Sequence, residues 1–167
     1  MSCDYIQGYY YSKPLDPEDY RKKLTETTKV NLAQRRRKRK KPLVIVIDDE
    51  EINRESIRVT IEDHFQVLTA SGGKEGLELL KRHISDVSLV VTDIAMPELD
   101  GFELLEIMNK SVMLYKIPVL VITSFGDIEN VAKALEMGAI DVINKPIEPK
   151  ILRQRIYNIM QLTQGAI

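Results

Sequence analysis

The stretch LVIVIDD, at residues 43–49, joins five apolar residues to two consecutive aspartates. A short run of this kind, rich in β-branched residues and without polar alternation, is typical of a strand buried on both faces of a parallel sheet. Three later runs have the same form: LVVT ends at Asp93, VLVI at Thr123 and VIN at Lys145. Ligands of open α/β sheets bind at the carboxyl ends of the strands. We therefore predict one site where these four ends meet.

Strand and helix patterns alternate over residues 43–164, which we predict to form the main domain. Strands are expected at 43–47, 65–69, 89–92, 117–122 and 140–144, and a helix pattern follows each of them. Five alternating units predict an α/β fold, a doubly wound five-stranded parallel sheet with helices on both faces. The second helix is expected at 75–81, and the fourth should be capped by Asp127 and end at Gly138. The apolar positions of the other patterns are Ile52, Ile57, Val59 and Ile61 in the first helix, Phe102, Leu105 and Met108 in the third, Val131, Ala134 and Leu135 in the fourth, and Leu152, Ile156, Ile159 and Leu162 on one face of the last.

The composition narrows the class of protein. With 24 basic and 25 acidic side chains in 167 residues, the formal net charge is -1, so no overall field favours nucleic acid or a membrane surface. The single cysteine, Cys3, excludes an internal disulfide framework. The longest apolar runs have five or six residues, far short of the ~20 that span a bilayer. We expect a cytoplasmic protein without a membrane span and without a nucleic-acid partner.

The residues at the strand ends suit the chemistry of phosphate. A carboxylate is ionised at neutral pH, since its ordinary pKa is about 4, and it is then a competent nucleophile towards phosphorus. Three neighbouring carboxylates repel one another, and Mg²⁺ is the cation expected among oxygen ligands. Lys145 and the hydroxyl of Thr123 could neutralise charge on the transferred group. We therefore predict a site for a divalent metal and a phosphoryl group.

Each of these residues also has a structural interpretation. An aspartate after a strand is often the cap of the next helix, a threonine there reflects β propensity, and a lysine is commonly a solvated surface residue. Their conjunction at four successive strand ends favours the functional interpretation. His64 and His83 lack the spacing of metal ligands and are interpreted as ordinary helix residues.

The chain from residue 43 to about 163 resembles the receiver domain of two-component response regulators. The resemblance is carried by the spacings of 45 residues from Asp48 to Asp93, 30 from Asp93 to Thr123 and 22 from Thr123 to Lys145. It also includes the dipeptides Met96-Pro97, Asp100-Gly101 and Gly138-Ala139. Such domains have a flavodoxin-like sheet of strand order 2-1-3-4-5, which the resemblance implies here.

The resemblance also implies a role for each site residue. Asp93 would accept a phosphoryl group from a histidine kinase or a phosphotransfer protein. Asp49, Asp93 and the backbone carbonyl of Ala95 would ligate Mg²⁺, and Asp48 would hold a metal-bound water. Thr123 would bond a phosphoryl oxygen, Lys145 would pair with the phosphoryl group, and the Lys145-Pro146 peptide bond would be cis. A homodimer is a further expected partner.

Three positions depart from the pattern of the family. Val142 stands three residues before the lysine, where relatives usually carry Tyr or Phe, so a switch by ring rotation is unavailable there. Ala95 and Phe125 are apolar where many relatives carry groups that guide water. Our hypothesis is that these two residues slow hydrolysis of the phosphoaspartate.

The N-terminal region, residues 1–33, is predicted to form a strand followed by a helix that begins near Asp16-Pro17. Residues 3–24 resemble the last strand and helix of an EAL-type cyclic-di-GMP phosphodiesterase domain. This resemblance implies that the chain is part of a longer signalling protein. The alternative is a private extension whose tyrosines pack on the main domain or on a neighbouring subunit. Residues 34–42 are interpreted as a basic linker, and the run RRRKRKK at 35–41 as solvated, since no DNA-binding helix pair accompanies it.

Two other functions remain as alternatives. A haloacid-dehalogenase-like phosphatase also uses an aspartate and Mg²⁺, but it needs Asp-x-Asp after its first strand, and Asp48-Asp49-Glu50 does not supply this. A degenerate receiver would serve only as an interaction or dimerisation module. We favour a phosphoacceptor that is not itself an enzyme, apart from slow self-dephosphorylation.

Overall fold

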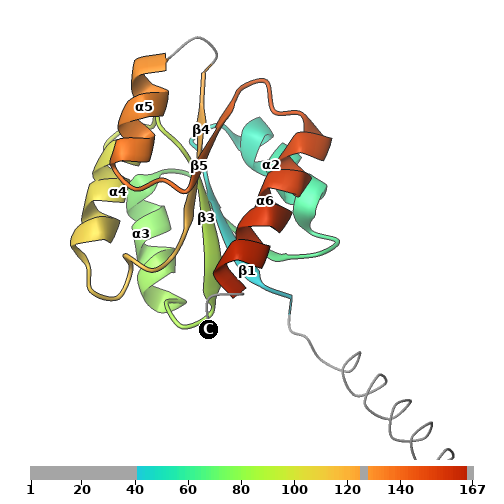
Figure 1. The fold of residues 1–167 in the computed structure, drawn as a ribbon, viewed down its shortest axis with the longest axis horizontal. Coiled ribbons are helices and arrows are strands. Elements are labelled where there is room, and N and C mark those ends of the chain that lie inside the picture. Colours follow the sequence, from blue (N-terminus) through green and yellow to red (C-terminus); the bar gives the residue numbers. More distant parts are fainter. Residues whose placement is uncertain (1–40, 125–127, 165–167) are drawn as a thin grey trace, which may run out of the picture. The chain divides into compact units, whose positions relative to one another are not determined.

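The protein, as a computed structural model, is described for residues 41–124 and 128–164. Strands and helices alternate through this part of the chain (Figure 1). The strands are β1 (Leu43–Ile47), β2 (Gln66–Ala70), β3 (Val87–Asp93), β4 (Val119–Thr123) and β5 (Asp141–Asn144). The helices are α2 (Glu51–Ile61), α3 (Gly73–Arg82), α4 (Gly101–Lys110), α5 (Ile128–Glu136) and α6 (Pro149–Gln164). The predicted N-terminal strand and helix lie outside the described residues.

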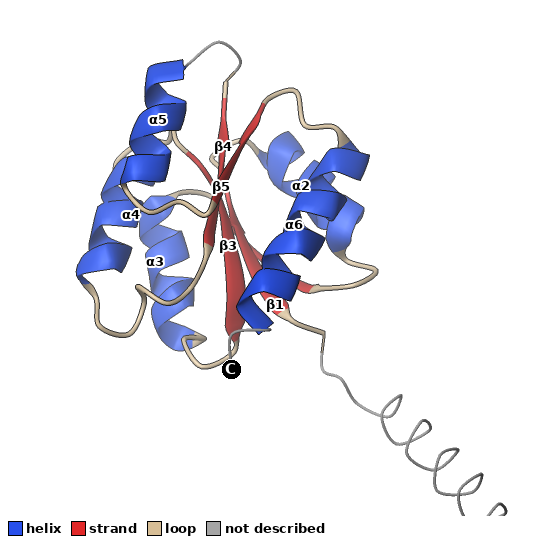
Figure 2. Cartoon of the chain, viewed as in Figure 1, coloured by secondary structure: helices blue, strands red, loops and turns tan. Residues whose placement is uncertain are grey.

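The five strands form one parallel sheet of order β2-β1-β3-β4-β5. Helices α2 and α6 cover one face of the sheet, and α3, α4 and α5 cover the other (Figure 2). This arrangement confirms the predicted fold class and strand order. The predicted strand bounds agree with the observed ones to within two residues. None of the helices in the described ranges is long and apolar enough to cross a bilayer.

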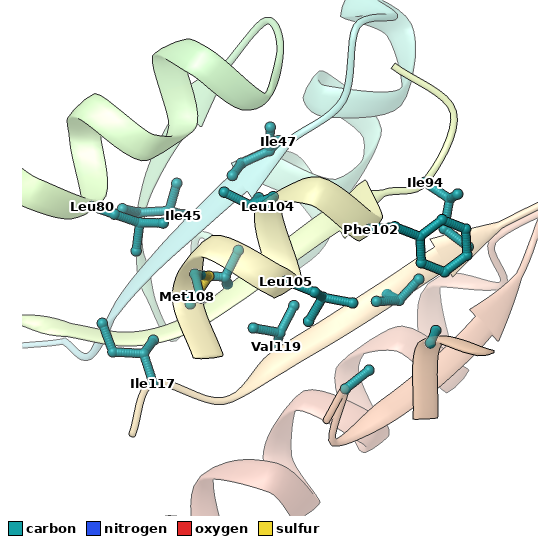
Figure 3. Packing of buried hydrophobic residues seen from close by; sticks show 14 of the residues in the cluster. Ile45, Ile47, Leu80, Ile94, Phe102, Leu104, Leu105, Met108, Ile117 and Val119 are labelled. Atoms are coloured by element: carbon teal, nitrogen blue, oxygen red, sulfur yellow. The ribbon is translucent and has the colours of Figure 1, made fainter. Parts of the chain in front are cut away.

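Two hydrophobic clusters explain why the strands show no polar alternation. Along β1, Ile45 and Ile47 pack towards α3 and α4, whereas Val44 and Val46 pack towards α2 and α6. Figure 3 shows part of the first cluster, in which Ile45 of β1 and Leu80 of α3 lie beside each other. Since both faces of the central strands are covered, every residue of β1 and β4 is buried.

Helix ends follow local rules that are only partly visible in the sequence. Asp100 caps α4 in a reciprocal box with Glu103, whose backbone N–H donates to the Asp100 side chain. At the end of α5, Gly138 has φ +89°, and the N–H of Ala139 donates to the carbonyl of Ala134. The helix therefore ends close to Gly138, as the sequence predicted. The predicted cap, Asp127, lies outside the described residues.

The apolar face predicted for the last helix is wrong at one position. Leu152, Ile156 and Ile159 are buried as expected, but Leu162 is 70% exposed. At about 100° per residue, Leu162 lies about 80° away from the stripe that starts at Leu152, and Thr163 continues that stripe instead. Thr163, which is half-buried, therefore takes the position on the buried face that the sequence pattern had assigned to Leu162.

Candidate functional site

Three carboxylates meet at the carboxyl ends of two adjacent strands. Asp48 and Asp49 follow β1, and Asp93 is the last residue of β3, which pairs with β1 through Ile47 and Thr92. One oxygen from each carboxylate lies within 4.8 Å of the other two. Asp48 and Asp93 are buried, whereas Asp49 is exposed. The structure thus brings together the acidic residues that the strand ends predicted.

Lys145 joins two of these carboxylates from the end of β5. Its Nζ lies 2.6 Å from Oδ2 of Asp93 and 3.1 Å from Oδ2 of Asp48. Burial by itself lowers the pKa of Lys145, but hydrogen bonds to Asp93 and Asp48, together with their charges, outweigh it and hold the pKa above its ordinary value. The Lys145-Pro146 bond is cis, as predicted. The ammonium therefore stays charged at neutral pH.

The acceptor candidate Asp93 is held on both carboxylate oxygens. The backbone N–H of Ile94 donates to Oδ1 at 2.6 Å, and Lys145 donates to Oδ2. Behind it, the N–H of Gly101 donates to the Ile94 carbonyl at 2.9 Å. A Cβ at residue 101 would lie 2.3 Å from the carbonyl oxygen of Asp93, so only glycine fits against this backbone. The Asp100-Gly101 pair therefore helps to fix the position of Asp93.

Thr123 lies at the same edge of the sheet. It is buried at the end of β4, one residue beyond Ile122, the partner of Asp93 in the ladder. Its carbonyl accepts from the backbone N–H of Lys145 at 2.7 Å, which ties the ends of β4 and β5 together. Thr123 and Lys145 therefore share one side of the site, while Asp48 and Asp49 form the other.

The remaining predicted positions surround this centre. Ala95 is exposed in the loop two residues after Asp93. Val142 is half-buried in β5 and packs against the cluster under α4 and α5. Phe125 lies outside the described residues.

Sequence reasoning missed three residues that contact the acidic pair. Asn53 Nδ2 lies 3.1 and 3.2 Å from the two carboxylate oxygens of Asp48, and the Glu50 N–H donates to Asp48 Oδ1 at 2.9 Å. The Arg54 guanidinium donates to backbone carbonyls of the same loop. The sequence does contain a signal for these contacts. When a helix begins directly after an acidic strand end, the polar side chains of its first turn point back towards that end.

The donor set fits a divalent cation. Three carboxylates carry a formal charge of −3 and the Lys145 ammonium +1, which leaves −2 at the centre. All the side-chain ligands are oxygens, as Mg²⁺ prefers, and it usually takes only one or two carboxylates along with water and phosphate. The exposed Asp49 leaves one side of the cluster open to such an ion and to a substrate.

Comparisons with known proteins agree with this geometry. Residues 44–157 match the family model of the response regulator receiver domain. A receiver domain protein of Clostridium thermocellum superposes with a TM-score of 0.70 at 30% identity, over 75% of this chain and 98% of that one.

Curated relatives show the same similarity. The "Two-component response regulator ORR11" of Oryza sativa subsp. japonica is 40% identical over 85 residues, which cover 51% of this chain and 57% of that protein. The "Probable transcriptional regulator ycf27" of Guillardia theta is 37% identical over 100 residues, covering 60% of this chain and 37% of that protein. The matched region is therefore less than two thirds of the length of either relative.

Proposed function

The chain belongs to the response regulator receiver domain family, and on that premise we propose that Asp93 accepts a phosphoryl group from a histidine kinase or a phosphotransfer protein. The observation that carries this proposal is the position of Asp93. Its carboxylate lies within 4.8 Å of two other carboxylates and accepts a 2.6 Å hydrogen bond from Lys145. Phosphorylation then biases a two-state equilibrium in the last two strand-helix units and changes a partner or dimer interface there.

In the proposed transfer, a carboxylate oxygen of Asp93 forms a bond to phosphorus while the bond from phosphorus to the imidazole nitrogen of the donor breaks. The nitrogen keeps the bonding pair, and the acyl phosphate remains on Asp93. Lys145, charged at neutral pH, neutralises phosphoryl oxygens. The Thr123 hydroxyl donates to one of these oxygens. The hydrogen bond from Ile94 orients the acceptor before transfer.

We propose Mg²⁺ as the cofactor. Asp49, Asp93 and the carbonyl of Ala95 would hold it, with Asp48 beside it through a bound water. The ion supplies positive charge to the phosphoryl oxygens in the transition state. The formal charge of −2 at the cluster supports this assignment.

A second proposal concerns the longer protein to which this receiver domain would belong. Residues 3–24 resemble the end of an EAL-type phosphodiesterase domain, so we propose that the receiver switches a multidomain cyclic-di-GMP signalling protein in the cytoplasm. The chain itself performs no turnover beyond slow self-dephosphorylation. The length of the parent gene tests the context, because a gene that starts at Met1 leaves no room for a preceding phosphodiesterase domain.

Intact-mass spectrometry after incubation with acetyl phosphate and Mg²⁺ tests the main proposal. One phosphoryl adduct is expected on the wild-type chain and none on Asp93→Asn. Asp63→Asn, an exposed aspartate on the loop after α2, serves as the matched control and should still form the adduct. Chelation of the metal should abolish the adduct. A wild-type chain without an adduct would favour the degenerate receiver, an interaction module only.

A further inference from the structure

Arg54 contacts the acidic pair through the backbone. From the first turns of α2, its Nη1 donates to the carbonyl oxygen of Asp48 at 2.7 Å and to that of Asp49 at 3.0 Å. One guanidinium nitrogen therefore bridges two successive carbonyls. Arg54 is half-buried, and Arg58, one turn further along the same helix, makes different contacts, with Glu55 and Glu62.

The two carbonyls have a specific relation to Asp49. The Asp48 carbonyl belongs to the peptide before the α-carbon of Asp49, and the Asp49 carbonyl belongs to the peptide after it. Each peptide is a rigid plane, so fixing both planes fixes the two backbone dihedral angles between them. The direction in which the Asp49 side chain leaves the backbone is then fixed as well.

Asp49 differs from the other two carboxylates in how it is held. The carboxylate of Asp48 accepts from Asn53, from the Glu50 N–H and from Lys145, and that of Asp93 accepts from Ile94 and Lys145. Within the described ranges, no hydrogen bond or ion pair reaches the carboxylate of Asp49. Its placement in the cluster therefore depends on its backbone, which Arg54 holds.

We propose that Arg54 is a positioning residue for the metal ligand Asp49. It pre-organises the loop after β1 so that the exposed carboxylate faces Asp48 and Asp93 before a cation arrives. This inference rests on the proposed magnesium site. It adds a residue on α2 that binds neither metal nor phosphate but sets the affinity of the site.

Electrostatics alone gives the opposite expectation. Arg54 is always charged, and a cation close to a metal site repels the metal. Removing that charge would strengthen Mg²⁺ binding if Arg54 acted only through its field. If Arg54 acts by holding the backbone, removing it weakens Mg²⁺ binding. The sign of the change therefore separates the two roles.

Isothermal titration of the chain with Mg²⁺ measures this sign without any phosphorylation. Arg54→Met, which removes both the charge and the donors, should raise the dissociation constant about tenfold, the usual effect of losing a group that orients a ligand. Arg54→Lys, which keeps one donor group, should lie between this variant and wild type. Arg58→Met should bind as wild type does, and urea unfolding without metal would correct each value for the folded fraction.

A double-mutant cycle excludes a general structural role. In an Asp49→Asn background, Arg54→Met should have no further effect on Mg²⁺ affinity, because the ligand that Arg54 positions is gone. An equal loss in both backgrounds would overturn the inference, as would unchanged or tighter binding by Arg54→Met in the native background. A wild-type chain that binds no Mg²⁺ would overturn the proposed cofactor together with this inference.

Discussion

Gly101 illustrates how a residue without a side chain can fix the position of Asp93, the proposed acceptor. The carbonyl of Asp93 and the α-carbon of Ile94 would lie 2.3 and 2.9 Å from a Cβ at this position. Both are backbone atoms, which cannot rotate away as a flexible side chain can. The end of β3 and α4 can therefore approach closely only because residue 101 is glycine.

The close approach of residue 101 to the backbone of Asp93 can be tested by substitution. Gly101→Ala should lower the free energy of unfolding by about 1–3 kcal/mol, because the added methyl overpacks the backbone of Asp93. Phosphorylation by acetyl phosphate should also slow. Gly72→Ala is the matched control, since a Cβ there meets nothing within 4 Å. Urea unfolding measures the first effect, and equal stability of the two variants would contradict it.

Ala95 leads to a prediction about the lifetime of the phosphorylated state. Its exposed methyl group cannot orient a water for attack on phosphorus. Ala95→Asn should therefore lose its phosphoryl group several-fold faster than the wild-type chain. Decay of the adduct, followed by intact mass after removal of acetyl phosphate, gives both rates. A wild-type rate above that of Ala95→Asn would refute the hypothesis that Ala95 slows hydrolysis.

At the scale of elements, the helices are attached to the sheet edge and to one another by a few polar contacts. Glu75, in the first turn of α3, accepts hydrogen bonds from the backbone N–H and the hydroxyl of Ser71, both at 2.7 Å. On the same side of the sheet, the Lys133 ammonium of α5 lies 4.0 Å from the ring centroid of Phe102 on α4. These contacts hold the start of α3 to the end of β2, and α5 to α4, at positions that the apolar pattern alone does not determine.

The contact of Glu75 predicts a pH dependence. The hydrogen bonds from Ser71 lower the pKa of Glu75 in the folded chain. Their contribution is therefore fully present above the ordinary pKa of a glutamate and is lost as the pH falls through the lowered folded value. Relative to Glu75→Gln, wild type should be more stable at pH 7 by less than about 1 kcal/mol, because the group is exposed.

Urea unfolding from pH 7 down to pH 4 follows this difference, which should shrink towards the acid end. Glu78→Gln, which removes an exposed carboxylate of the same helix that pairs with Arg82, should show a smaller difference. A stability gap that widens on acidification would contradict the prediction.

The pairing of Lys133 with Phe102 gives a prediction about helix packing. Lys133→Gln should destabilise the fold by about 0.5–1 kcal/mol, as expected for an exposed cation over an aromatic ring. The same substitution at Lys81, an exposed residue of α3, should have no measurable effect. Thermal unfolding of the two variants provides the comparison.

At the scale of the whole molecule, the sheet order decides which strand ends meet. The order β2-β1-β3-β4-β5 places the three central strands β1, β3 and β4 side by side, so Asp48, Asp93 and Thr123 lie at one edge although they are far apart in sequence. The fold and this edge could be predicted, because burial of both sheet faces leaves a local, apolar signature on each central strand.

Other features could be predicted only in part, because they depend on packing as well as on local pattern. The contacts of Asn53 and Arg54 require the exact direction in which α2 leaves β1. The sequence names plausible residue types there, and only the three-dimensional arrangement decides their partners. Leu162 is a different case, because its angle of about 80° from the buried stripe of α6 could be read from the sequence.

The basic run before the sheet leads to a prediction about the chain as a whole. Lys41, its last residue, donates to the Glu62 carbonyl at 2.7 Å, and the formal net charge of the chain is only -1. Deleting residues 35–40 should leave any weak affinity for a labelled DNA duplex unchanged at physiological salt. Fluorescence anisotropy tests this, and a salt-sensitive affinity that disappears on deletion would contradict it.

The bridge from Lys145 to Asp48 spans 97 residues of sequence. The carboxylates at the ends of β1 and β3 are synthesised well before the ammonium that pairs with them, so during translation they lack this partner until β5 is made and docks beside β4. Under the proposed function, a nascent or truncated chain that ends before β5 should be inert to its phosphate donor. The order of synthesis would thereby keep incomplete chains out of the signalling pathway.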